Sequence, residues 1–370
     1  MTLATTSDQA RDGWPIWGHA AAAESLQRAI RANRVSHAYL IGGPEGVGKR
    51  TLALVFAQAL CCPIDRADRA VPCGACPSCR RIARGTHPDV QMVSLGTQAA
   101  TAEKSASKNT SLTIDTIRSL RASAALRPME ATRRVLIVDD AETLQGPAQE
   151  ALLKTLEEPP TAVTIVLLAN DAEALLPTIR SRCQSIELHP VGSAAIAAGL
   201  VAAGSDDGVA RELAVLAAGR PGWASRAAAD PGVRQRQADA IVRAVAWIES
   251  GPYERLVTAV RTGDGFAKRR DDVYADLEAV LGVWRDVMLV AGGAPNHATY
   301  LPHLATIEAV ARSTDLAQAA RALASIQRCL ADLEANVRPR LALEGMVLQW
   351  PTQGSSPTPA GERDRWRSTS

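Results

Sequence analysis

Gly43-Pro44-Glu45-Gly46-Val47-Gly48-Lys49-Arg50-Thr51 is the stretch that decides the fold of this 370-residue chain. It matches the phosphate-binding pattern G-x-x-x-x-G-K-[S/T] except at its last position, where Arg50 replaces the hydroxyl residue. In that pattern backbone N–H groups and the lysine hold phosphates, and the hydroxyl binds Mg²⁺. A guanidinium offers no lone pair to a metal ion and carries charge of the same sign. The loop therefore predicts a site that can hold ATP or ADP but is poorly equipped for Mg²⁺ and for hydrolysis.

The residues around this loop favour a nucleotide site. An apolar run at residues 38–41 precedes the loop and an alanine-rich and leucine-rich segment at 49–60 follows it, which predicts strand, loop and helix. Thr51 is a poor substitute for the missing hydroxyl, because one helical residue later it points about 100° further around the axis. The candidate nucleotide contacts in the loop are Gly43, Pro44, Gly46, Val47, Gly48, Lys49, Arg50 and Thr51.

Two acids follow a second apolar run. The β-branched stretch 134–138 predicts a buried parallel strand that delivers Asp139 and Asp140 to the C-terminal edge of a sheet. In nucleotide sites the first acid assists Mg²⁺ and the next, usually glutamate, polarises the attacking water. Asp139 keeps the first role, and Asp140 is one methylene short for the second. A third strand, 163–169, ends at Asn170, which we expect near a γ-phosphate or water. The alternative for the two acids is a solvated turn.

Cysteines are the second informative feature, because five of the seven lie between Cys61 and Cys79. Clustered thiols with C-x2-C spacing in a cytosolic chain indicate a metal site rather than disulfides. We predict structural Zn²⁺, which takes four thiolates. The predicted ligands are Cys73, Cys76, Cys79 and Cys62, with Cys61 as the alternative fourth ligand. Two other interpretations are buried or redox cysteines, and a DNA-binding finger, for which residues 80–84 give only a faint basic helix.

Length and composition set the remaining limits. A chain of 370 residues predicts two or three domains. No run of eighteen apolar residues appears, and the N-terminus lacks a signal pattern, so we expect a cytoplasmic protein without a membrane partner. The formal net charge of +2 does not by itself argue for nucleic-acid binding. The polar, low-complexity segment 97–110 predicts a loop.

Two further segments carry a family resemblance. ALLKTLEEPP at residues 151–160 and LPTIRSRC at 176–183 resemble the clamp-loader branch of the AAA+ ATPases, of which Ser-Arg-Cys is the hallmark. The resemblance runs from about Ile16 to Trp350, and the cysteine cluster after the P-loop helix is similar to that of bacterial clamp-loader subunits. It implies an α/β AAA+ P-loop domain, a parallel sheet flanked by helices, with a zinc-binding insertion, a small helical lid domain and an all-α C-terminal collar domain.

The resemblance also implies domain boundaries. We expect a lid of three helices in which Gly222 takes the place of the family's sensor arginine, with Arg220 and Arg226 as alternative sources of that charge. We also expect a collar through which subunits assemble. The expected parts are a disordered N-terminus (1–13), the AAA+ domain (14–190) with its cysteine module (61–79), the lid (191–232), the collar (233–350) and a disordered tail (351–370).

For function, the resemblance implies a division of labour. Arg182 of the Ser-Arg-Cys triplet would act in trans as an arginine finger in a neighbouring subunit's ATP site; the alternative is a surface arginine paired with Glu157 or Glu158. The implied partners are gamma/tau and delta subunits in a hetero-pentamer, the sliding clamp, and primed DNA through the complex. The implied subunit has no polymerase or appreciable ATPase activity of its own. An active gamma/tau-type ATPase is the alternative, but it would carry Thr at position 50 and Glu at position 140.

Overall fold

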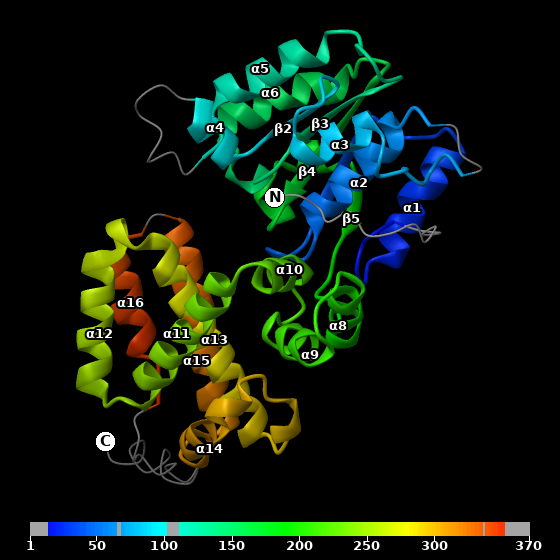
Figure 1. Cartoon of the computed structure of the whole chain (residues 1–370). Coiled ribbons are helices and arrows are strands. Elements are labelled where there is room, and N and C mark those ends of the chain that lie inside the picture. Colours follow the sequence, from blue (N-terminus) through cyan, green and yellow to red (C-terminus); the bar gives the residue numbers. More distant parts are fainter. Residues whose placement is uncertain (1–13, 65–67, 102–110, 336, 352–370) are drawn as a thin grey trace, which may run out of the picture. The chain divides into compact units, whose positions relative to one another are not determined.

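The computed structural model describes residues 14–64, 68–101, 111–335 and 337–351 (Figure 1). These residues form two compact units, the first ending at residue 228 and the second beginning at residue 229. The expected disordered N-terminus and nearly all of the expected tail lie outside the described residues. No helix in these ranges is long and apolar enough to cross a membrane.

A parallel sheet of five strands organises the first unit. The strand order is β2-β3-β4-β1-β5, and every pairing is parallel. All residues of β1, β3 and β4 are buried, as the apolar runs in the sequence predict. The strands are β1 (Ala38–Gly42), β2 (Val90–Val93), β3 (Arg134–Val138), β4 (Val163–Ala169) and β5 (Gln184–Glu187).

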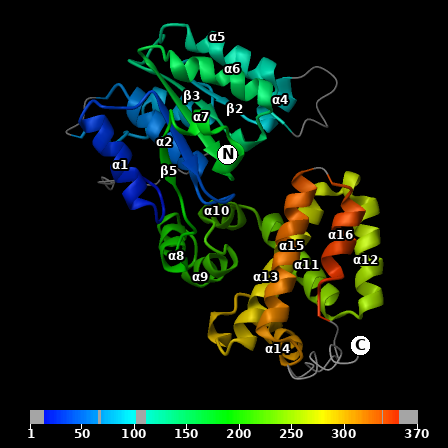
Figure 2. The same cartoon turned by 180° about the vertical axis from the view of Figure 1, so that it is seen from behind.

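Helices cover both faces of this sheet (Figure 1, Figure 2). Alternate strand residues point to opposite faces, so Ile41 and Ile137 join one core cluster and Leu40 and Leu136 join the other. The first cluster includes α1 (Ala20–Arg31), α2 (Lys49–Cys61) and α3 (Pro77–Arg84). The second includes α5 (Ile114–Ala124), α6 (Gly146–Glu157) and α7 (Pro177–Arg180). The expected α/β fold class is confirmed.

The expectation of a loop across 97–110 is wrong at its beginning, where α4 (Leu95–Thr101) forms. Ser94 and Thr97 make a local cap: the N–H of Ser94 donates to Oγ1 of Thr97, and the N–H of Thr97 donates to Oγ of Ser94. This reciprocal pairing satisfies donors that a helix start would leave open. The residues from 102 to 110 lie outside the described residues.

A small helical subdomain, the lid, completes the first unit with α8 (Ser193–Ala202), α9 (Asp207–Leu216) and α10 (Pro221–Ala229).

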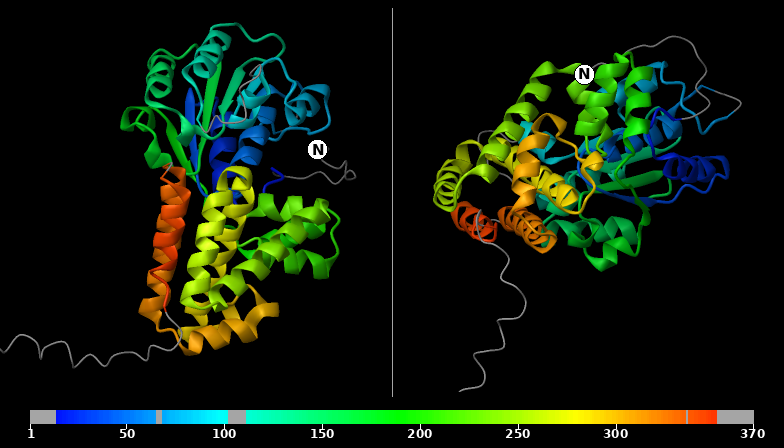
Figure 3. Two further views of the ribbon diagram at one scale, coloured as in Figure 1. Left: turned by 90° about the vertical axis from the view of Figure 1, so that its left-hand side faces the viewer. Right: turned by 90° about the horizontal axis from the view of Figure 1, so that it is seen from below.

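The second unit is helical, and Figure 3 shows its long helices side by side. Trp284 is fully buried in this unit, and its ring lies 5.7 Å from that of Trp350. The neighbouring Asp286 is fully buried and accepts the N–H groups of Thr299 and Tyr300 at 2.8 Å. The helices are α11 (Pro231–Glu249), α12 (Pro252–Gly265), α13 (Arg270–Ala291), α14 (Leu304–Arg312), α15 (Leu316–Glu334) and α16 (Pro339–Val347).

Asp89 fixes the turn that leads into β3. Its side chain is fully buried and accepts three consecutive backbone N–H groups, those of residues 129–131, at 2.7 to 2.9 Å. The guanidinium of Arg134 lies 3.4 Å away. Burial acts to raise the pKa of Asp89, but the backbone donors and Arg134 outweigh it, so that pKa lies below its usual range.

We predict that Asp89→Ala lowers the free energy of unfolding by about 3–5 kcal/mol, because Arg134 and three N–H groups lose their buried acceptor. Since the folded pKa is depressed, this stabilisation is fully present above the unfolded pKa, and it is lost as the pH falls through the folded pKa. Urea unfolding at pH 7 and at decreasing pH measures both effects. Asp115→Ala, which breaks an exposed pair with Arg118, is the control and should cost no more than about 1 kcal/mol. Equal effects of the two variants would contradict the role of Asp89.

Candidate functional site

The P-loop adopts a conformation that requires its glycines. Gly43, Gly46 and Gly48 have φ values of 137°, 75° and 119°, in the region that side chains rarely adopt. A Cβ on Gly43 would also lie 2.3 Å from the carbonyl oxygen of Leu188. The loop leads directly into α2, which begins at Lys49. The three glycines therefore let the backbone take the curved conformation that a phosphate-binding loop requires.

The ammonium group of Lys49 donates hydrogen bonds to oxygens of the protein itself. Its Nζ donates to the carbonyls of Gly43 at 2.5 Å and Pro44 at 3.0 Å, and to Oδ1 of Asn170 at 2.6 Å. Burial lowers the pKa of Lys49, while nearby acids, Glu142 first among them, act to raise it. The structure thus brings Asn170 into contact with the P-loop lysine.

Glu142 belongs to the same chain of contacts, and sequence reasoning missed it. Nδ2 of Asn170 donates to Oε1 of Glu142 at 2.6 Å, so the amide joins this carboxylate to Lys49. Burial raises the pKa of Glu142. Its one sequence signal is its place two residues after the paired acids at the end of β3.

The paired acids have separate surroundings. Asp139 lies 4.0 Å from the guanidinium of Arg50, and burial followed by its neighbour Asp140 raises the pKa of Asp139. Asp140 has a φ of 57°, and its Oδ2 accepts the N–H of Leu95 at 3.1 Å. Arg50 therefore stands beside the acid expected to assist Mg²⁺, and Asp140 is bonded to the start of α4. Thr51 is exposed.

Four of the clustered cysteines form a group that could hold a metal ion. The sulfurs of Cys62, Cys73, Cys76 and Cys79 all lie within 4.8 Å of one another. The Cys62–Cys76 pair is 4.0 Å apart and the Cys73–Cys79 pair 3.9 Å. A tetrahedral Zn²⁺ with bonds of about 2.3 Å needs sulfurs about 3.8 Å apart. The spacing and the donor type both fit such an ion.

Backbone N–H groups of the same segment donate to two of these sulfurs. Cys76 caps α3 and accepts the N–H of Cys79 at 3.4 Å, and Cys73 accepts the N–H of Cys76 at 3.2 Å. Burial acts to raise the pKa of Cys73, but backbone N–H donors lower it to about 7. Cys61 lies outside the group, since its Sγ contacts the carbonyl of Arg133 at 3.6 Å. Of the two alternatives for the fourth ligand, Cys62 is the one placed beside the other three.

His87 is not part of this group. Its Nδ1 accepts the N–H of Asp89 at 3.1 Å, and its Nε2 lies 2.9 Å from Oγ of Ser78. That serine hydroxyl donates to the carbonyl of Cys61. His87 therefore ties the residue before Cys79 to the start of β2.

Arg182 lies just before β5, with 37% of its side chain exposed. Its guanidinium donates to the carbonyl of Thr178 at 3.0 Å and to Oε1 of Glu157 at 3.1 Å. The pairing with Glu157 weighed as an alternative from sequence is thus present. Such an exposed pair contributes only about 0–1 kcal/mol, so it can be exchanged readily for another partner.

Comparison with known proteins finds relatives of the first unit. The family model described as "DNA polymerase III, delta subunit" matches residues 18–192. The delta' subunit of Pseudomonas aeruginosa is 35% identical over 208 residues, 56% of this chain and 60% of that protein. The delta' subunit of Bacillus subtilis is 32% identical over 189 residues, 51% of this chain and 53% of that protein. Residues 18–192 are thus similar to DNA polymerase III delta and delta' subunits.

The same region is similar to a second type of DNA polymerase III subunit. Subunit tau of Bacillus subtilis is 35% identical over 176 residues, 47% of this chain and 28% of tau. The chain thus spans 60% or less of these curated relatives. The resemblance inferred from ALLKTLEEPP and Ser-Arg-Cys is confirmed, and the matched region contains the P-loop, the cysteine group and Arg182.

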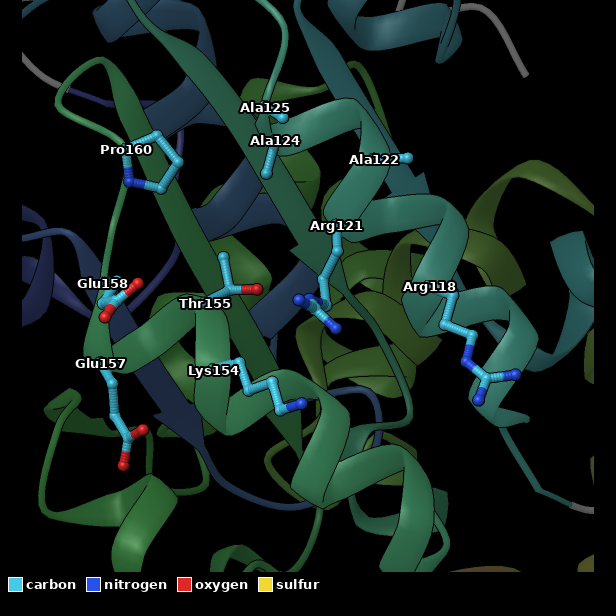
Figure 4. A pocket seen from close by; sticks show the side chains of 10 residues that line it. All are labelled: Arg118, Arg121, Ala122, Ala124, Ala125, Lys154, Thr155, Glu157, Glu158 and Pro160. Carbon is cyan, nitrogen blue, oxygen red and sulfur yellow. The ribbon is translucent and has the colours of Figure 1, made fainter.

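A groove of about 560 Å³ lies between α5 and α6 and includes Glu157 in its lining (Figure 4). Arg118 and Arg121 of α5 and Lys154 of α6 line it, together with Glu157, the acceptor of Arg182. Its lining residues come from α5, α6 and the turn after α6, and not from the P-loop. This hollow is therefore not the nucleotide site of the family fold.

Proposed function

We propose that this chain is the delta' subunit of a bacterial DNA polymerase III clamp loader, a stator with a hydrolysis-deficient nucleotide site of its own. It would join gamma/tau and delta subunits in a hetero-pentamer that opens the sliding clamp and places it on primed DNA. The match of residues 18–192 to the delta-subunit family model supports the complex. The similarity to both delta' and tau leaves the choice of subunit to the chemistry of the site.

Arg50 favours the delta' type of subunit over the tau type. It replaces the hydroxyl that would bind Mg²⁺, and it stands 4.0 Å from Asp139, the acid that would assist the same ion. A cation beside that carboxylate repels Mg²⁺ by like charge. We assign no hydrolysis to this site. We assign to it the holding of ATP or ADP by Gly43, Pro44, Gly46, Val47, Gly48, Lys49, Arg50, Thr51, Asp139, Asp140 and Asn170.

Two further roles belong to the proposal. Zn²⁺ would be held by Cys62, Cys73, Cys76 and Cys79, and it would supply no chemistry beyond fixing α3 against α2. Arg182 would leave Glu157 and enter the ATP site of the neighbouring gamma/tau subunit, where its charge would stabilise the transferring phosphoryl group. The exposure of its side chain and the weakness of its present pair support that exchange.

We predict that the isolated chain shows no appreciable ATP turnover, with or without primed DNA. The loop offers Mg²⁺ no hydroxyl ligand at position 50, and the positive charge of Arg50 repels the ion. A steady-state phosphate-release assay measures this, with a gamma/tau subunit as the positive control. Mixing with gamma/tau and delta should give a stable complex on size exclusion. Turnover at the rate of the gamma/tau control would favour the alternative of an active ATPase, and failure to enter the complex would remove the stator role.

A further inference from the structure

The backbone carbonyls of the P-loop are held from several sides by the protein's own groups. Lys49 bonds to those of Gly43 and Pro44, and Nε2 of His19 lies 3.0 Å from that of Val47. The carbonyl of Gly46 accepts the N–H of Gly222 at 2.8 Å. The last contact differs from the others, because it comes from the lid.

Gly222 lies in the first turn of α10, where backbone N–H groups have no partner within the helix. Pro221 before it has no N–H, and the N–H groups of Trp223 and Ala224 donate to the carbonyl of Arg220 at 3.0 and 3.1 Å. Gly222 is thus left to find an acceptor outside its helix. The P-loop supplies that acceptor, so the Gly46 carbonyl caps α10 in the place of a capping side chain.

Both residues of this contact need to be glycine. A Cβ on Gly222 would lie 2.9 Å from the carbonyl oxygen of Gly46, which is closer than real Cβ atoms approach. Gly46 has a φ of 75°, and a Cβ on it would lie 3.3 Å from Cβ of Arg220. Any side chain at 222 therefore pushes the lid helix off the loop, and this includes an arginine placed there as a nucleotide sensor.

The turn before α10 is fixed as well. Gly219 has a φ of 84°, and its carbonyl accepts the N–H of Val191 at 2.9 Å. A Cβ at 219 would lie 2.5 Å from Cβ of Pro190. The entrance to the lid and the start of its last helix are therefore joined to each other as well as to the P-loop.

We infer that Gly222 is a positioning residue that latches the lid directly to the P-loop, so that the lid is held without a nucleotide. The latch uses a carbonyl of the loop, whereas phosphates are bound by its N–H groups. It is therefore compatible with a bound nucleotide but does not depend on one. The latch is a property of the isolated chain and does not depend on the proposed stator role.

Amide hydrogen exchange of the full chain, followed by mass spectrometry with and without ATP and Mg²⁺, tests the latch. In the wild-type protein we expect the same exchange across 221–229 in both conditions, with Gly222 protected in the nucleotide-free state. In Gly222→Ala we expect exchange in α10 and in residues 43–48 to be about 2- to 30-fold faster, the range that loss of a helix cap implies. Gly222→Arg should behave as Gly222→Ala.

The matched control is Gly192→Ala, in the approach to the lid, where φ is −58° and no atom lies within 4 Å of an added Cβ. Its exchange should equal that of the wild type. Unchanged exchange in Gly222→Ala, or a wild-type lid that becomes protected only when ATP is added, would overturn the latch. If Gly222→Ala fails to fold, the protection of the Gly222 amide in nucleotide-free wild type decides, and an unprotected amide refutes it.

Discussion

Arg182→Ala is expected to slow ATP hydrolysis at the neighbouring site of a reconstituted loader by about 10³- to 10⁵-fold, the effect of removing an arginine finger. This corresponds to about 4–7 kcal/mol of transition-state stabilisation. Assembly should be unaffected, because among the described residues the guanidinium is bonded to Thr178 and to Glu157, the latter in an exposed pair.

A single-turnover experiment separates this effect from hydrolysis at the other sites. We expect the amplitude of the fast phosphate-release phase to fall by the contribution of one site, with the rest of the phase preserved. Size exclusion of the mixture shows whether the variant still assembles. An unchanged amplitude in a fully assembled complex would rule out the finger.

Two variants serve as matched controls for Arg182. Arg180→Ala removes a guanidinium two residues away, which pairs with Glu173 instead, and it should leave the fast phase unchanged. Glu157→Gln removes the charge that now pairs with Arg182, and it should not slow hydrolysis, because the proposed finger would act away from this partner. Slowing by Arg180→Ala to the same degree would point to a general effect on this edge of the subunit.

The sheet and the P-loop could be predicted because their signals are local. Apolar runs mark the buried strands, and glycines mark a backbone that takes positive φ at residues 43, 46 and 48. The cysteine group was also local in its spacing, but spacing alone did not separate Cys61 from Cys62. That choice depends on which way each side chain leaves the end of α2, where Cys61 turns to the carbonyl of Arg133 in the core.

The contacts that complete the site could not be read from sequence, because they join distant positions. Asn170 meets Lys49 across 121 residues and Glu142 across 28. His19 reaches Val47 from the turn before α1, and nothing in its neighbourhood marks it as a P-loop contact. From sequence, Gly222 is predicted to stand where the family has a sensor arginine. Its backbone contact with Gly46 could not be predicted, because it forms only when the lid is folded. Local patterns thus define the loop, and tertiary packing determines what holds it.

Metal content provides the second prediction with a large effect. We expect one Zn²⁺ per wild-type chain, complete loss in Cys62→Ser, and full retention in Cys61→Ser. Only Cys62 has its sulfur within 4.8 Å of the other three. The two positions are adjacent and receive the same substitution. The variants therefore differ in whether the sulfur that is removed belongs to the four-cysteine group. Elemental analysis of the purified proteins measures the outcome.

Loss of the ion should spread beyond the cysteines, because structural zinc contributes about 10–16 kcal/mol of apparent binding energy in isolated fingers. With Zn²⁺ in the proposed site, part of that energy would hold α3 on α2. There Nε2 of Gln58 donates to the carbonyl of Cys79 at 2.9 Å, and Oγ of Ser78 donates to that of Cys61 at 3.0 Å. Since α2 begins at Lys49, we expect chelation to lower the midpoint of thermal unfolding and to raise amide exchange along the P-loop helix. Retained metal in Cys62→Ser, or a metal-free wild type with the same midpoint, would contradict the zinc site.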